Sequence, residues 1–331
     1  MKAVLSERPG GAETLRLVEV AEPAPGAGEI RVRVRAVGIN FPDLLIIEDK
    51  YQFKPARPFA PGAELAGVVD AIGPGVTGFV EGERVMALPL WGGLAEAVCV
   101  KADIAHKLPE SVSFEAAAAL EMTYGTAYYG LVQRGGLKAG ETLLVLGAAG
   151  GVGLAAVELG VALGARVVAA ASSAAKVAVA REHGAAAGVV YPAGALDRDG
   201  QKALTEAFKA ECGGGADVIF DTVGGDYTEP ALRAIAWLGR LMIVGFPAGI
   251  AKIPANLPLL KSCDVRGVFW GAAVERDKAG HHRAMDALLA MMVDGRIAPR
   301  IHRAYPLAEA GEAISALGRR EILGKVVVSL E

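Results

Sequence analysis

The stretch that decides the fold is TLLVLGAAGGVGLAAVEL, residues 142–159. An apolar, strand-like run enters a glycine-rich turn, a helix-forming sequence follows at once, and a second strand-like run comes at 166–170. Glycines let the backbone approach a pyrophosphate closely, and the unpaired amides of a helix N-terminus favour its charge. The order of strand, turn, helix and strand therefore predicts a dinucleotide site that includes Ala149, Gly150, Gly151, Val152 and Gly153. The alternative is a turn that only packs the helix against the strand.

Strand-like and helical segments continue to alternate from Thr142 to about Val293. The expected strands are 142–147, 165–171, 188–191, 216–221, 239–245 and 264–270, and the expected helices lie near 152–163, 174–183, 201–212, 227–237 and 277–293. Continuous apolar strands in strict alternation with helices indicate a parallel sheet covered on both faces. The pattern predicts a doubly wound, Rossmann-type dinucleotide fold.

The rest of the chain is β-rich. From about Leu15 to Asp103, short alternating or β-branched runs are separated by Gly and Pro, which is typical of antiparallel strands. The C-terminal segment ends in a strand-like run, GKVVVSL at 324–330, and such a strand needs a sheet to join. We therefore predict an α/β protein whose Rossmann domain, 123–293, is inserted into a β-rich domain made of 1–122 and 294–331.

Composition excludes several classes of function. The 331 residues carry 34 Lys and Arg against 37 Asp and Glu, a net charge of −3, so nucleic acid and anionic membrane surfaces are not expected partners. The three cysteines show no paired spacing and no signal peptide is visible, which predicts a cytoplasmic protein. The longest uncharged stretch, Thr142–Val157, is too short and too rich in glycine to span a membrane.

The residues after the second Rossmann strand bear on which dinucleotide is bound. An Asp or Glu at this point accepts the ribose hydroxyls of NAD and repels a 2′-phosphate. This chain instead has Ala170-Ala171-Ser172-Ser173 and then Lys176. Hydroxyls and an ammonium favour the extra phosphate, so Ser172, Ser173 and Lys176 predict NADPH as the cofactor. Lys176 as an ordinary solvated helix residue is the alternative.

Further motifs extend over nearly the whole chain. They are GINFPDLL (38–45), PGAELAGVV (61–69), GERV (82–85), GLAEAV (93–98), TYGTAYYGL (123–131), DTVGG (221–225) and GKVVV (324–328). With the glycine-rich turn, they resemble the zinc-independent medium-chain dehydrogenases/reductases of the quinone oxidoreductase, zeta-crystallin-like family. The resemblance implies that the β-rich part is a GroES-like catalytic domain.

Departures from zinc-dependent relatives bear on the mechanism. Asn40 stands where those enzymes supply a Cys and Ala63 where they supply a His, so Gly62 and Glu64 alone remain of that segment. A tetrahedral zinc site needs three protein ligands, and this position lacks its thiolate and its imidazole. We therefore expect no metal. The pair His281-His282 shows no ligand spacing and is expected to be a solvated helix face.

The resemblance also implies a set of cofactor contacts. It places Thr126 beside the nicotinamide and Asp221 and Val223 under the cofactor. It runs the backbone of Gly245, Phe246, Phe269 and Trp270 along the nicotinamide side. Tyr191 matches a position that contacts the adenosine phosphate, and Arg320 one that contacts the pyrophosphate, with Arg319 as a rival. For Tyr128-Tyr129, helix packing is the preferred interpretation.

Two residues are candidates for catalysis. Hydride transfer to a quinone or an enone leaves a phenolate or enolate, which hydrogen bonds alone can stabilise. The resemblance puts Asn40 next to the nicotinamide and the acceptor oxygen, and puts Tyr51 where related enoyl thioester reductases carry a Tyr proton donor. Alternatively, Asn40 caps the following helix and Tyr51 is a wall aromatic.

The expected function is NADPH-dependent reduction of a quinone or an α,β-unsaturated carbonyl compound without a metal. The alternatives are a 2-enoyl thioester reductase, with Lys50, Lys54 and Arg57 as a basic rim, and a catalytically weak, crystallin-like NADPH-binding protein. The resemblance implies a homodimer in which the last Rossmann strands of two subunits pair edge to edge.

Overall fold

The computed structural model describes residues 1–319 and 322–330, and the chain divides into two compact units. Unit 1 comprises Met1–Met122 and Met285–Glu331, and unit 2 comprises Thr123–Ala284. The sequence placed the second boundary at 293/294, whereas in the structure it lies inside helix α10 (Lys278–Val293). The α/β class is confirmed, with a Rossmann unit interrupting a β-rich unit.

Unit 2 contains the predicted parallel sheet. Its strand order is β10-β9-β8-β11-β12-β13, the doubly wound order in which the first strand lies near the middle. The strands are β8 (Thr142–Leu146), β9 (Arg166–Ala171), β10 (Ala187–Val190), β11 (Ala216–Asp221), β12 (Ile235–Ile243) and β13 (Asp264–Gly267). Leu144, Val168 and Ile219 are fully buried, as expected for strands covered on both sides.

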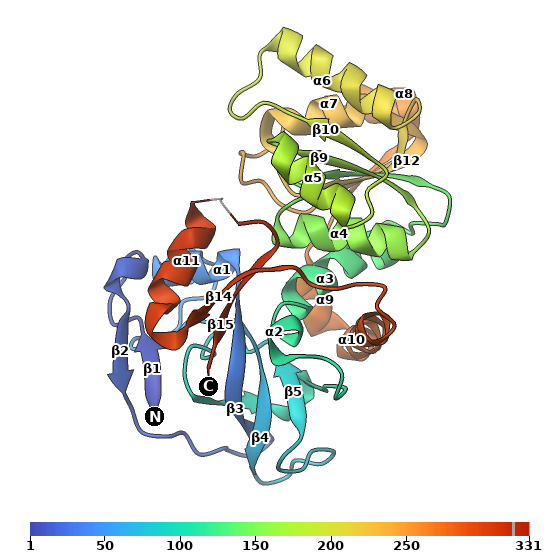
Figure 1. Ribbon diagram of the computed structural model, residues 1–331. Helices are drawn as coiled ribbons and strands as arrows, with labels where there is room; N and C mark the ends of the chain where they lie inside the picture. Colours follow the sequence, from blue (N-terminus) through green and yellow to red (C-terminus); the bar gives the residue numbers. More distant parts are fainter. Residues whose placement is uncertain (320–321, 331) are drawn as a thin grey trace. The chain divides into compact units, whose positions relative to one another are not determined.

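Helices cover both faces of this sheet (Figure 1). One face carries α4 (Gly151–Ala162) and α5 (Ala174–Glu182), and the other carries α6 (Arg198–Glu211), α7 (Thr228–Arg233) and α8 (Asn256–Lys261). The remaining helical segments of this part of the chain are α3 (Glu121–Tyr128), η3 (Tyr129–Arg134), η4 (Gly225–Tyr227) and α9 (Trp270–Arg276).

Two expected elements of unit 2 differ in the structure. The helix expected over 227–237 ends at Arg233, and Trp237 belongs to β12, because Ile235–Ile243 pairs with β11. The strand expected over 264–270 ends at Gly267, and Trp270 begins α9. In both cases a short apolar run was compatible with either element, and sheet pairing decided.

A buried polar chain ties three helices of unit 2 together. The Tyr124 hydroxyl on α3 donates to Glu158 Oε2 on α4 at 2.6 Å, and Glu158 Oε1 contacts His183 Nδ1 at the C-terminus of α5. Burial and the adjacent Glu158 carboxylate raise the pKa of Tyr124 well above its usual value. The phenol therefore stays protonated and holds α3 against α4.

Unit 1 is built on a mixed sheet with the order β14-β15-β3-β4-β5-β7, and β6 also pairs with β3. Its strands are β3 (Glu29–Ile39), β4 (Glu64–Ile72), β5 (Arg84–Ala87), β6 (Ala97–Lys101), β7 (Ala105–Lys107), β14 (Ile301–Pro306) and β15 (Lys325–Ser329), and β1 (Lys2–Leu5) pairs separately with β2 (Arg16–Glu19). The C-terminal strand β15 lies antiparallel to β3, as the sequence required. Strand β14 was not predicted.

Short helices complete unit 1. They are η1 (Ala12–Thr14), α1 (Phe41–Ile47), η2 (Ala102–Ile104), α2 (Phe114–Ala117), η5 (Leu307–Glu309) and α11 (Ala310–Gly318). Ile30, Val32 and Val326 lie in its fully buried core. Across residues 1–319 and 322–330, no helix combines the length and apolarity that crossing a membrane requires.

Candidate functional site

The glycine-rich turn of unit 2 has the shape that a pyrophosphate needs. Gly147 follows β8 with φ +74°, and Gly150 is the N-cap of α4. A Cβ at Gly153 would lie 2.1 Å from the Gly147 carbonyl oxygen, so this glycine allows α4 to pack directly on the turn. A Cβ at Gly150 would meet nothing closer than 3.6 Å, so its outer side is open. The residues fit a dinucleotide whose phosphates bind at this helix N-terminus.

The DTVGG segment forms a loop beside that turn. Asp221 ends β11, is 1% exposed, and accepts from Val223 N at 2.8 Å, Gly224 N at 2.9 Å and the Thr228 hydroxyl at 2.6 Å. Desolvation raises the pKa of Asp221, and these three donors oppose the rise. Thr222 Oγ1 donates to Leu146 O at 2.8 Å and so fixes the loop to the end of β8. Asp221 thus shapes a wall of the site, and its contact with a cofactor stays a prediction.

The other predicted nicotinamide segments follow β12 and β13. Gly245 N donates to Asp221 O, so the Gly245-Phe246 loop lies next to DTVGG. Phe246 and Phe269 are 59% and 61% exposed, whereas Trp270 is 8% exposed. The carboxyl ends of β8, β11 and β12 therefore gather the predicted residues at one edge of the sheet, where open α/β sheets bind ligands.

The candidate phosphate group lies after β9. Ser173 caps α5 and accepts from Lys176 N at 3.3 Å, and Lys176 Nζ donates to the Ser172 hydroxyl at 3.2 Å. The structure thus brings the ammonium and both hydroxyls together at the carboxyl end of the strand. The segment 171–176 contains no acidic residue to oppose a phosphate.

Three further cofactor positions were predicted, Tyr191, Thr126 and Arg320. Tyr191 is buried, its ring centroid lies 4.7 Å from that of Tyr227, and burial, the largest cause, raises its pKa to about 12. Thr126 is half-buried on α3. Arg320 lies outside the described residues. The cofactor contacts of all three residues stay predictions.

Unit 1 holds a buried polar cluster that the sequence did not reveal. Lys325, the first residue of β15, donates from Nζ to Asn40 Oδ1 at 2.6 Å and to Glu64 Oε2 at 3.0 Å. The Asn40 amide donates to Glu64 Oε2 at 2.8 Å and to Gly38 O at 3.2 Å. Met122 N donates to Glu64 Oε1 at 3.0 Å. Both N–H groups of the Asn40 amide and both oxygens of Glu64 are therefore engaged inside unit 1.

Asp43 extends this cluster on α1. Its Oδ2 accepts from Asn40 N at 2.8 Å, and its Oδ1 accepts from Gly62 N and Ala63 N at 3.0 Å each. Asn40 is the N-cap of α1, as one of the two sequence interpretations had it. Desolvation raises the pKa of Asp43 to about 6, against the lowering effect of its hydrogen bonds and of the Lys325 charge.

A zinc ion does not fit the position that zinc-dependent relatives use. Asn40 and Ala63 offer neither thiolate nor imidazole, and the Glu64 carboxylate is neutralised by the Lys325 ammonium at 3.0 Å. Lys325 is the sequence feature that could have indicated this cluster. A charged residue inside the apolar run GKVVV has to find a buried partner.

Tyr51, the second catalytic candidate, lies half-buried in unit 1, with its ring centroid 5.9 Å from that of Phe53. Desolvation is the largest cause that raises its pKa, and the negative charge of Asp43 adds to it. A phenol in this setting keeps its proton and can donate a hydrogen bond.

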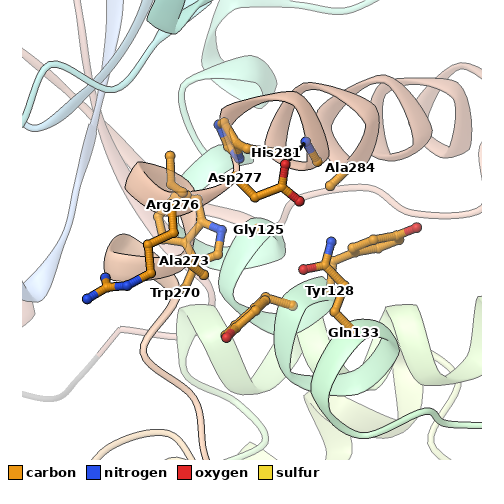
Figure 2. Close-up of a pocket in the computed structure, with 12 residues that line it drawn as sticks. Gly125, Tyr128, Gln133, Trp270, Ala273, Arg276, Asp277, His281 and Ala284 are labelled. Carbon is orange, nitrogen blue, oxygen red and sulfur yellow. Dashed lines mark hydrogen bonds between the residues drawn. The ribbon is translucent and has the colours of Figure 1, made fainter.

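A cavity of about 270 Å³ lies within unit 2, between α3 with η3 on one side and α9 with α10 on the other. Figure 2 shows Trp270, Tyr128, Gln133 and His281 around it. The solvated setting expected for His281 is wrong, because this residue is 9% exposed and its ring packs edge-on against Trp270 at 5.7 Å. Tyr128 and Tyr129 are half-buried and line the cavity, and their role in helix packing stays a prediction.

Comparison with known proteins gives consistent matches over the whole chain. Residues 26–110 match the family described as alcohol dehydrogenase GroES-like domain, and 151–290 match that described as zinc-binding dehydrogenase. The quinone oxidoreductase-like protein 2 of Bos taurus is 38% identical over 318 residues, which cover 95% of this chain and 89% of that protein.

Solved structures agree with these sequence matches. The quinone oxidoreductase of Thermus thermophilus, described also as its complex with NADPH, is 36% identical with a TM-score of 0.85, and 100% of each chain is covered. The Escherichia coli quinone oxidoreductase complexed with NADPH is 29% identical with a TM-score of 0.88, again over 100% of each chain.

Proposed function

Because the chain belongs to the zinc-independent, quinone oxidoreductase-like branch of the medium-chain dehydrogenases/reductases, we propose that it uses NADPH to reduce a quinone or an α,β-unsaturated carbonyl compound. Membership makes it an oxidoreductase. The preference for NADPH, the class of acceptor and the roles of individual residues are the proposal.

The observation that carries the proposal is the donor set around Glu64. The Glu64 carboxylate is bound by Lys325 Nζ and by the Asn40 amide instead of being left to ligate a metal ion, so we propose an acceptor that needs hydrogen bonds alone. Hydrogen-bond donors suffice for an acceptor whose reduced form is a delocalised phenolate or enolate, whereas a simple alkoxide requires a stronger acid. The site chemistry therefore favours conjugated acceptors.

The cofactor has a binding surface of matching chemistry in unit 2. We assign its pyrophosphate to the amides of Gly151, Val152 and Gly153, and its 2′-phosphate to Ser172, Ser173 and Lys176. NADPH, when bound, supplies a hydride from the C4 position of its nicotinamide. The contacts with it are proposed from the family resemblance, for Thr126, Asp221, Val223, Gly245, Phe246, Phe269, Trp270, Tyr191 and Arg320.

Of the two catalytic candidates, we assign the donor role to Tyr51. Both N–H groups of the Asn40 amide already donate, one to Gly38 O and one to Glu64 Oε2. Its first role is therefore to hold β3, β4 and β15 in place. The Tyr51 hydroxyl, protonated at neutral pH, donates to the acceptor oxygen as negative charge develops there.

Steady-state NADPH oxidation tests the proposal. We expect turnover with 1,4-naphthoquinone to exceed turnover with a crotonyl thioester, and Tyr51→Phe to lower kcat/KM for the quinone about five- to tenfold, the value of one neutral hydrogen bond. Tyr305→Phe, a buried tyrosine of the same unit, is the matched control and leaves kcat/KM unchanged.

Other outcomes select the alternatives. Faster thioester reduction that Tyr51→Phe abolishes would make the protein an enoyl thioester reductase. NADPH binding without turnover of any acceptor would make it a crystallin-like binding protein.

We also propose the homodimer predicted from the sequence. Strand β13 is the last strand in the order of the unit 2 sheet and pairs with β12, and its Val265 is 40% exposed. Leu259 and Leu260 of the preceding helix α8 are 78% and 65% exposed. A second copy that continues the sheet would cover this apolar edge. The cytoplasmic location stays a prediction.

Sedimentation at micromolar concentration is expected to give twice the mass of the chain. Val265→Asp, which places like charges on two facing strands, should shift the species to the monomer. Glu275→Lys, an exposed position of α9, is the control. A wild-type monomer would contradict the proposal.

A further inference from the structure

Glu158 is the one charged residue in the sequence of α4, and it is buried, with 6% of its surface exposed. Its two carboxylate oxygens contact different helices. Oε2 accepts from the Tyr124 hydroxyl of α3 at 2.6 Å, and Oε1 contacts Nδ1 of His183, the C-cap of α5. Burying a carboxylate costs free energy unless hydrogen bonds compensate. Glu158 therefore needs both partners, and they join three helices at one point.

Two of these helices carry the proposed phosphate sites of the cofactor at their N-termini. The pyrophosphate is assigned to the first amides of α4, and the 2′-phosphate to Lys176 with Ser173, the N-cap of α5. Glu158 lies seven residues beyond Gly151, about two helical turns from the first site. His183 lies seven residues beyond Lys176, about two turns from the second. The Glu158–His183 contact thus joins the two phosphate-binding helices behind their N-termini.

The C-terminal end of α5 also packs directly on α4. Gly184 follows His183 with φ +96°, and a Cβ at this glycine would lie 3.0 Å from Val161 Cγ2 of α4. Both helices pack on β9, the strand between them in the sequence. A short helix moves as one rigid element, so contacts at its C-terminal end bear on where its N-terminal end lies. The position of Lys176 relative to the start of α4 depends on this junction.

We propose that Glu158 and His183 are positioning residues, which hold Lys176 at the distance from the α4 N-terminus that a 2′-phosphorylated dinucleotide requires. The inference rests on the proposed use of NADPH and adds the side chains that enforce it. The 2′-phosphate and the pyrophosphate belong to one molecule, and linked groups gain affinity from each other only where both can bind at once. NADH uses the α4 site alone, so its binding should not depend on His183.

His183→Leu, which removes the contact with Glu158, tests this inference. We expect the Kd for NADPH to rise about fivefold, the scale of one hydrogen bond, and the Kd for NADH to stay within about twofold. His183→Asn, whose amide can donate from nearly the same place as Nδ1, should bring the Kd for NADPH back to within about twofold of wild type. Fluorescence titration of each reduced nucleotide measures both constants.

A buried hydrogen bond elsewhere in unit 2 provides the matched control. Thr205 Oγ1 donates to Gln201 O at 2.8 Å within α6, on the other face of the sheet. Thr205→Val should lower the Tm and leave both Kd values unchanged. Thermal unfolding shows whether each variant is folded at the assay temperature. If His183→Leu does not fold, His183→Ala replaces it, because water can then reach the Glu158 carboxylate, and the same rise for NADPH alone is expected.

A double-mutant cycle identifies the residue through which His183 acts. In a Lys176→Ala background the protein has no ammonium left to position at this site. Adding His183→Leu to Lys176→Ala should therefore leave the Kd for NADPH within about twofold of that of Lys176→Ala alone. Fully additive effects would show that His183 does not act through Lys176 and would overturn the inference.

The outcomes separate this inference from the proposed function. If the wild type prefers NADPH and the loss of the His183 imidazole raises both Kd values equally, or neither, the contact does not position Lys176. The inference is then overturned while the proposed cofactor stands. If the wild type binds NADH as tightly as NADPH, the proposed cofactor preference is wrong and the inference is overturned with it.

Discussion

Lys325→Met is expected to lower the free energy of unfolding by about 3–5 kcal/mol, the cost of removing one partner from a buried ion pair. Lys325 is 4% exposed, and its Nζ lies 3.0 Å from Glu64 Oε2 and 2.6 Å from Asn40 Oδ1. Methionine keeps the length of the side chain but leaves the Glu64 carboxylate, 1% exposed, without a cation. Urea unfolding followed by circular dichroism measures the change.

An exposed lysine provides the control. Lys101 also pairs with a glutamate, Glu29, at 2.9 Å, but its side chain is 60% exposed. Lys101→Met should therefore change stability by less than about 1 kcal/mol. A loss as small for Lys325→Met would contradict the buried charge pair. Adding Glu64→Gln to Lys325→Met should recover part of the loss, because the double variant removes the uncompensated charge.

The pH dependence of the variant follows from Asp43. Its pKa of about 6 is already above the ordinary value, with desolvation as the main cause and the Lys325 charge among the opposing ones. Without Lys325 the pKa of Asp43 in the folded state rises further. A carboxyl that binds its proton more tightly when folded adds stability as the pH falls through its folded pKa. The difference in the free energy of unfolding between wild type and Lys325→Met should thus become smaller as the pH falls from about 8 to about 5.

Residues close in sequence made the Rossmann half of this fold predictable. Strand β8, the glycine-rich turn and α4 form one continuous stretch, and the apolar runs that follow it are long enough to identify strands. The same local patterns were ambiguous at Trp237, where pairing with β11 overrides a helix-like sequence.

The polar cluster of unit 1 was not predictable, because its members are brought together by sheet register. Lys325 and Asn40 are 285 positions apart, and they meet because Val326 pairs with Ile39 across β15 and β3. A motif match identified Asn40 and Glu64 as positions of interest. It could not show that their hydrogen bonds point to each other and to a lysine at the far end of the chain.

Lys176→Ala is expected to raise the Kd for NADPH about 10- to 100-fold and to leave the Kd for NADH within about threefold. Lys176 Nζ lies 3.2 Å from the Ser172 hydroxyl, so an ammonium and a hydroxyl are already adjacent after β9. A 2′-phosphate bound there accepts charge-assisted hydrogen bonds, which are stronger than neutral ones. NADH lacks that phosphate, so its affinity should not depend on Lys176.

Titration of each nucleotide by its fluorescence on binding measures both constants. Arg181→Ala, which removes one positive charge from the other end of α5, is the matched control and should leave both unchanged. Ser172→Ala should raise the Kd for NADPH less than Lys176→Ala does, because a neutral donor is lost.

Raising the salt concentration should reduce the difference in the Kd for NADPH between wild type and Lys176→Ala, because the ammonium acts by charge at a partly exposed site. Equal weakening of NADPH and NADH would place Lys176 in the support of the turn, and no change in either would make it a solvated helix residue.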